Sequence, residues 1–193
     1  MKTKVLSLPA ILLSLSSLPA HAHTGIGTVQ GLVDGLLHPL IGVDHLLVMF
    51  AIGLWAAMRG GRSFWMLPMT FLIVMGGGAA LHFVGITVIA AESWVAFSVL
   101  TAGVLVWRNT PMSSVLAVAL VAVFALVHGY VHAAELANGT NALGYSAGFL
   151  LMTALLHGLG VAIGLLGKPK LKMICAGFGL LCSVVGLSLL VGV

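Results

Sequence analysis

Long apolar stretches separated by short polar breaks are the feature that most constrains the fold of this chain. Six such stretches follow one another, at about 35–58, 64–90, 93–107, 112–135, 142–166 and 171–193. A helix that crosses the hydrocarbon core of a bilayer needs about 20 mainly apolar residues. The third stretch is shorter, so we expect it to extend into its flanks or to lie near-perpendicular to the bilayer. The pattern predicts an all-α integral membrane protein with a bundle of six transmembrane helices.

The composition excludes an ordinary soluble domain. The chain is 61% hydrophobic and only 6% charged, whereas a soluble domain is about half apolar and a quarter charged. The formal net charge is +4, but the basic residues are scattered and form no block of the kind that binds nucleic acid. Glycines cluster at 76–78 and 158–164, where small residues would let membrane helices approach closely. The expected partner is therefore the lipid bilayer and not a nucleic acid.

Residues 1–22 have the pattern of a cleavable signal peptide. Lys2 and Lys4 give the positive start, residues 5–18 form a short apolar core, and the chain then reads Pro-Ala-His-Ala up to residue 22. Cleavage after this A-x-A pattern would make His23 the N-terminus of the mature chain, on the outer side of the membrane. The alternative is that the segment stays as an extra anchor. Residues 23–193 would then form the transmembrane domain.

Export of the N-terminus fixes the expected orientation of the six helices. The loops after the first, third and fifth helices would face the cytoplasm. These loops hold every basic residue that remains after cleavage, namely Arg59, Arg62, Arg108, Lys168, Lys170 and Lys172. The positive-inside rule agrees with this orientation. The sequence therefore predicts a multi-pass protein of the bacterial inner membrane with both termini in the periplasm, and it leaves a homo-oligomer open.

Histidines and acidic residues interrupt the apolar stretches at a substantial cost. An ionisable side chain inside a bilayer costs about 2.5–3.5 kcal/mol on insertion scales, so such residues point to function. With the orientation above, all of them except His157 fall outside the membrane or in its outer half. His157 lies near or below the centre. The others are His38, Asp44, His45, His82, Glu92, His128, His132 and Glu135. Together they predict a vestibule that opens to the periplasm and narrows toward the midplane.

The spacing of these residues in the first predicted helix suggests a metal site. At 100° per residue, His38 and His45 share a helical face with Met49, and Asp44 lies on its flank. Asp44 is either a direct ligand or a carboxylate that holds a histidine ring in place by a hydrogen bond. Met49 is expected to fill core space.

A second group of the same kind lies in the fourth predicted helix. His128, His132 and Glu135 follow at i, i+4 and i+7, on one stripe. Imidazole and carboxylate ligands suit nickel, zinc, copper or iron. The two groups together predict a protein that handles a transition metal.

Both motifs resemble those of the HupE/UreJ family of nickel permeases. The segment HPLIGVDHLLVM holds the pattern His38-x5-Asp44-His45, which is similar to a family signature. The segment VHGYVHAAE is similar to the family pattern FHGxxHGxE, with Val127 and Ala133 in place of Phe and Gly. These two replacements affect packing and not ligand chemistry. The segments ESWVAFSV, from Glu92, and TALLHGLG, around His157, also resemble the family, and the likeness covers essentially the whole mature chain.

The resemblance implies a secondary transporter that takes up Ni²⁺ across the inner membrane for hydrogenase or urease maturation. Co²⁺ or another divalent metal stays open as the substrate. On this reading His23 captures the ion first, through its α-amine and imidazole, and the ligands of the first and fourth helices then replace its water. His82 and Glu92 line the approach, and His157 passes the ion toward the cytoplasm. The protein would not be an enzyme and would need no organic cofactor.

Two other classes of membrane protein use polar stripes of this kind. One is a haem protein with histidines of facing helices as axial ligands. The other is a channel for protons or small solutes. A membrane metalloprotease is disfavoured because the sequence has no HExxH motif.

Overall fold

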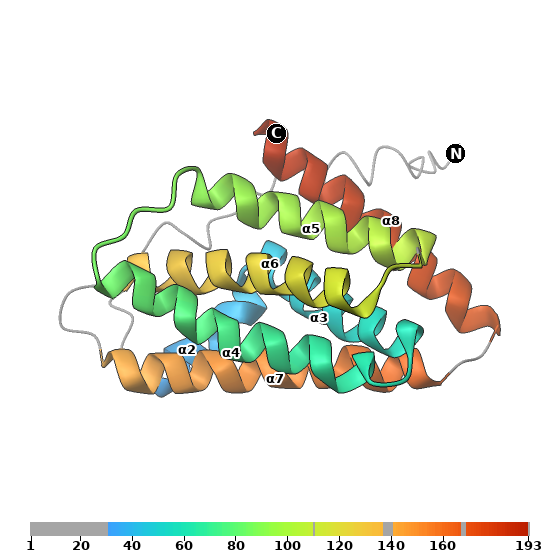
Figure 1. Cartoon of the computed structure of the whole chain (residues 1–193), viewed down its shortest axis with the longest axis horizontal. Helices are drawn as coiled ribbons and strands as arrows, with labels where there is room; N and C mark the ends of the chain where they lie inside the picture. Colours follow the sequence, from blue (N-terminus) through green and yellow to red (C-terminus); the bar gives the residue numbers. More distant parts are fainter. Residues whose placement is uncertain (1–30, 110, 137–140, 167–168, 193) are drawn as a thin grey trace, which may run out of the picture.

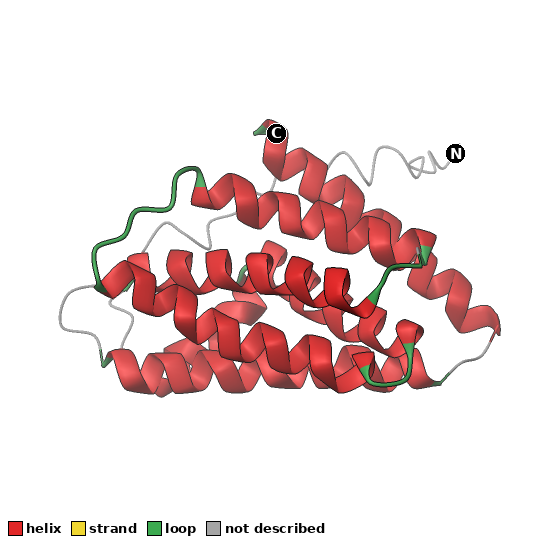
Figure 2. Cartoon of the chain, in the orientation of Figure 1, coloured by secondary structure: helices red, strands yellow, loops and turns green. Residues whose placement is uncertain are grey.

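The computed structural model describes residues 31–109, 111–136, 141–166 and 169–192. Within these ranges the chain forms seven α-helices and no strand (Figure 2), so the predicted all-α class is confirmed. The predicted signal peptide, residues 1–22, and His23 lie outside the described residues.

The helices pack side by side into an elongated bundle (Figure 1). Their bounds are α2 Leu32–Ile41, α3 Val43–Arg59, α4 Ser63–Phe83, α5 Ala91–Arg108, α6 Ser114–Ala134, α7 Ala142–Leu165 and α8 Pro169–Val191. Helices α4, α6, α7 and α8 are each long and apolar enough to cross a membrane, and α2 with α3 would make a fifth, bent span. The chain is thus a multi-pass membrane protein, and the predicted total of six spans depends on α5.

The stretch expected as one helix over 35–58 is two helices, α2 and α3, that meet at Gly42 with a bend of 84°. Pro39 contributes to the break because it has no N–H to donate to the carbonyl four residues before it. Gly42 follows with an extended backbone, and a glycine has a low helix propensity. The angular argument that put His38 and His45 on one face of a single helix is therefore wrong, although the bend brings the two residues together by another route.

Glycines set four close helix pairings, one of which joins α2 to α7 at Gly35 and Gly148. A Cβ atom would collide with the backbone of the neighbouring helix at Gly53 and Gly160 between α3 and α7, at Gly78 and Gly129 between α4 and α6, and at Gly103 and Gly179 between α5 and α8. The expectation of close packing holds only in part for the glycine clusters. A Cβ at Gly76, Gly77 or Gly158 would meet no atom within 4 Å. In each cluster, therefore, some glycines pack against a neighbouring helix and the others face open space.

The basic residues at helix ends gather at one end of the bundle, on the right in Figure 1, where α3 and α5 end and α4 and α6 begin. The Arg59 side chain donates a hydrogen bond to the carbonyl of Met112 at 2.8 Å and lies over the ring of Trp55, 5.1 Å from its centroid. Arg108 lies over Trp107 in the same manner. This cationic end is opposite to the end where α4 and α6 finish, so the charge distribution fits one cytoplasmic face.

Candidate metal centre

Three helices turn regular stripes of side chains toward one another, which is why the polar groups converge. Residues four apart lie on the same helical face. The stripes are His45, Met49 and Gly53 on α3; Phe124, His128 and His132 on α6; and Tyr145, Phe149, Thr153 and His157 on α7. Nearly every member is buried. The side chains of the two motifs therefore meet, although the motifs lie on different helices.

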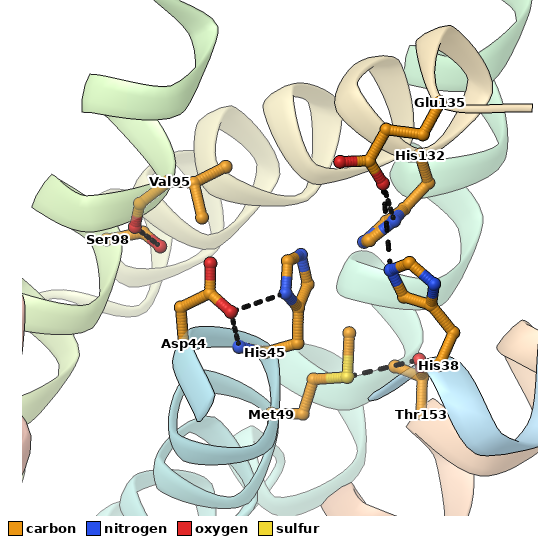
Figure 3. Close-up of polar contacts among 9 residues, drawn as sticks. All are labelled: His38, Asp44, His45, Met49, Val95, Ser98, His132, Glu135 and Thr153. Carbon is orange, nitrogen blue, oxygen red and sulfur yellow. Dashed lines mark hydrogen bonds and ion pairs between the residues drawn. The ribbon is translucent and has the colours of Figure 1, made fainter. Parts of the chain in front are cut away.

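The outer part of the site is formed by His38, His132 and Glu135, whose side chains point toward one another in Figure 3. One ligand atom of each lies within 4.8 Å of the other two. Glu135 Oε2 is 3.6 Å from His38 Nε2 and 3.4 Å from His132 Nδ1. Two donor atoms bound at about 2.1 Å to one ion are about 3.0–3.4 Å apart. The three groups therefore need only small movements to bind a cation together.

His132 connects this outer group to the histidines below it. Its ring centroid is 4.8 Å from that of His38 and 4.3 Å from that of His45. The ring of His45 lies 5.1 Å from that of His128. The imidazoles thus form a continuous series from His38, on α2, down to His128, on α6.

Asp44 holds the ring of His45. Its Oδ1 atom accepts hydrogen bonds from His45 Nδ1 at 2.7 Å and from the backbone N–H of His45 at 2.9 Å (Figure 3). A proton on Nδ1 leaves Nε2 as the nitrogen that can bind a metal. A carboxylate in this position also fixes the orientation of the imidazole ring. Of the two roles predicted for Asp44, the geometry corresponds to a carboxylate that orients a histidine ring.

Two deeper histidines are held in the same tautomer by backbone carbonyls. His128 Nδ1 donates to the carbonyl of Phe124 at 2.8 Å, and His157 Nδ1 donates to that of Met49 at 2.6 Å. Each Nε2 atom is buried and has no hydrogen-bond partner among the described residues. A buried nitrogen of this kind is costly unless something binds it. Both rings are therefore pre-oriented with an available lone pair.

The aromatic and hydroxyl side chains around the site were not predicted from the sequence. The ring of Phe149 lies 4.0 Å from that of His132, and Thr153 donates a hydrogen bond to the sulfur of Met49 at 3.2 Å. The four-residue spacing of Tyr145, Phe149 and Thr153 before His157 could have revealed them. Met49 is buried as expected, but it also fixes His157 through its carbonyl.

His82 and Glu92 lie outside this cluster. The half-buried ring of His82 contacts those of Phe83 and Tyr130, 5.7 and 5.6 Å away between centroids. Glu92 is exposed in the first turn of α5. The role of both in lining an approach stays a prediction, as does the role of His23, which is outside the described residues.

Comparison with known proteins supports the interpretation of these motifs. The sequence profile of the family described as HupE / UreJ protein matches residues 11–189. The chain is 40% identical over 174 residues to Protein HupE of Rhizobium leguminosarum bv. viciae. The matched region covers 90% of this chain and 91% of the relative. No solved structure matches. The chain belongs to the HupE/UreJ family of membrane metal transporters and is not an enzyme.

Proposed function

We propose that the chain is a permease that takes up Ni²⁺ across the bacterial inner membrane, to supply hydrogenase or urease maturation. The observation that carries the proposal is the meeting of His38, His132 and Glu135, with their ligand atoms within 4.8 Å of one another. Family membership supports transport of a metal. The donor set supports the class of metal.

The donors favour a borderline transition metal. Neutral imidazoles with one or two carboxylates suit nickel, zinc, copper and iron, whereas Mg²⁺, Ca²⁺ and Mn²⁺ prefer all-oxygen sites. Of the site's ligand candidates only His38 and Glu135 have partly exposed side chains, at 14% and 19%. A hydrated ion would therefore meet these two first and exchange water for their donors.

The charge of the site favours a divalent ion. Asp44 and Glu135 are the two carboxylates of the imidazole series. With neutral histidines, one divalent cation balances both negative charges. Balance matters here because an uncompensated charge in a buried, low-dielectric site costs several kcal/mol.

The proposed route follows from the order of the residues. His23, at the mature N-terminus, captures the ion outside, and His82 and Glu92 line the approach. The ion then binds His38, His132 and Glu135, passes His45 and His128, and reaches His157. In the proposed topology, with six spans and both termini in the periplasm, the partly exposed end of this series would face outside and the arginine-rich end would face inside.

The test is metal uptake into proteoliposomes with Ni²⁺, Co²⁺, Zn²⁺ and Mn²⁺ in competition. We expect Ni²⁺ to accumulate first and Mn²⁺ to compete poorly, and we expect His45→Ala and His132→Ala each to abolish uptake. Ser183→Ala is the matched control, because Ser183 bonds only within α8, to the carbonyl of Gly179. Preference for Co²⁺ over Ni²⁺ would change the assigned substrate. Uptake no greater than in empty liposomes would refute the proposed function.

A further inference from the structure

Phe71 contacts the two deepest histidines, one from each of two other helices. It is near the middle of α4 and its side chain is fully buried. Its ring centroid is 5.4 Å from that of His128, on α6, and 5.1 Å from that of His157, on α7. The same phenyl ring thus contacts the last imidazole of the outer series and the single imidazole beyond it.

His157 lies deeper than the outer series. Its Nδ1 atom is bonded to the carbonyl of Met49, which is one helical turn after His45 on α3. Four residues correspond to about 6 Å along the helix axis. An ion that passes from His128 to His157 would therefore move inward alongside the ring of Phe71, which contacts both imidazoles.

The two imidazoles are fixed, but Phe71 is held by packing alone. Backbone carbonyls restrain the rings of His128 and His157. Phe71 has no polar atom and can offer no donor to a cation that has lost its water. Apolar constrictions of this kind close ion pathways in membrane proteins.

We propose that Phe71 is a gate between an outer metal station, at His38, His45, His128, His132 and Glu135, and an inner station at His157. The inference rests on the proposed function. Rotation of the Phe71 ring opens the step from His128 Nε2 to His157 Nε2, and this rotation limits the rate of flux. With the ring in place, an ion can occupy the outer station while the inner half of the pathway stays closed.

The experiment separates binding from flux. Ni²⁺ binding is measured by calorimetry on detergent-solubilised protein, and downhill Ni²⁺ flux is measured in proteoliposomes that hold a Ni²⁺ indicator. We expect Phe71→Ala to bind Ni²⁺ as the wild type does and to pass it about tenfold faster, which corresponds to about 1.4 kcal/mol removed from the barrier. Phe71→Trp, with a larger ring, should bind normally and pass little Ni²⁺.

Phe178→Ala is the matched control. Phe178, on α8, packs against Phe50 with ring centroids 4.9 Å apart, so its loss removes a phenyl ring from another aromatic pair. Its flux should equal that of the wild type. If Phe71→Ala does not fold, Phe71→Leu decides, since leucine preserves burial and still opens the passage.

Two failures are distinguishable. Wild-type vesicles that pass no Ni²⁺ would overturn the proposed function, and the gate with it. Wild-type flux together with an unchanged or slower rate in the folded Phe71→Ala or Phe71→Leu variant, at normal binding, would overturn the gate alone.

Discussion

Proton placement on single imidazoles decides which nitrogen of each ring can bind a metal. His45 donates a hydrogen bond from Nδ1 to a carboxylate, whereas His128 and His157 donate theirs to main-chain carbonyls. In all three rings Nε2 is therefore the nitrogen that can bind a metal, although two of the partners lie on α3 and one on α6. His45 differs from the others because its partner, the Asp44 carboxylate, is charged, and a negative charge beside the ring attracts a bound cation.

Asp44→Asn tests that difference with little change in volume. The amide cannot supply the negative charge and its NH₂ group can reverse the tautomer of His45. We expect Ni²⁺ affinity to fall by about 10–100-fold, measured by calorimetry in detergent, with a normal unfolding temperature. Ser183→Ala, on α8, should leave affinity unchanged. Unaltered affinity in Asp44→Asn would mean that the carboxylate has no influence on the ligand.

His132→Ala and His82→Ala form a matched pair of imidazole deletions. His132 contacts the rings of His38 and His45 and faces Glu135, whereas His82 contacts Phe83 and Tyr130. Equilibrium dialysis should show that His132→Ala loses Ni²⁺ binding and that His82→Ala retains it. If His82 lines the approach, the rate of Ni²⁺ uptake by His82→Ala would fall while its Ni²⁺ binding stayed unchanged. Equal loss of binding in both variants would contradict the division between cluster and approach.

At the scale of elements, the register between α3 and α7 sets the position of the inner histidine. Gly53 lies against the backbone carbonyl of His157. The ring of the same His157 donates a hydrogen bond to the carbonyl of Met49, which is one turn before Gly53 on α3. The same contact that allows the helices to approach therefore also aligns His157 with the pathway.

Gly53→Ala should disturb both packing and function. Its Cβ atom would collide with the His157 carbonyl, so α3 and α7 must separate. Overpacking of this kind costs about 1–3 kcal/mol, and we expect a lower unfolding temperature in detergent and slower uptake. Gly77→Ala, on α4, adds the same methyl group where nothing lies within 4 Å, and it should resemble the wild type. A Gly53→Ala variant with wild-type stability would show that the helices do not pack this closely.

The elements show which features could be predicted from the sequence. Helical periodicity predicted that His128, His132 and Glu135 share a face, because α6 is continuous through them up to its last turn. The same reasoning failed for His38 and His45, because it treated Pro39 and Gly42 as part of one helix. A Pro and a Gly within one apolar stretch are a known sign of a broken helix at a transporter site.

The contacts between helices could not be derived from periodicity. Phe71 reaches His128 and His157 because of the way that α4 pairs with α6. That pairing is set by Gly78 and Gly129, each of which fits against the backbone of the opposing helix. A sequence pattern shows that a glycine can allow close approach, but not which helix approaches it.

At the scale of the whole molecule, α5 decides how many times the chain crosses the bilayer. It has 18 residues and is not among the helices that pass on length and hydropathy. It packs closely against α8 at Gly103 and Gly179, and its buried residues include Ser98. A helix covered in this manner can cross a membrane with a less apolar sequence, since other helices shield its polar groups from lipid.

The two ends of α5 provide a direct test of this topology. Thr87, in the loop before α5, and Ser114, at the start of α6, are both exposed. In a background without Cys175 and Cys182, which are buried and free, we expect Thr87→Cys to react with an impermeant maleimide on intact spheroplasts. Ser114→Cys should react only after the membrane is opened. Labelling of both cysteines from outside would mean that α5 does not cross the membrane. The chain would then have at most five spans, and its arginine-rich end would be divided between the periplasmic and cytoplasmic sides. Opposite labelling is what the charge distribution requires, because Arg59, Arg62 and Arg108 then share the cytoplasmic face.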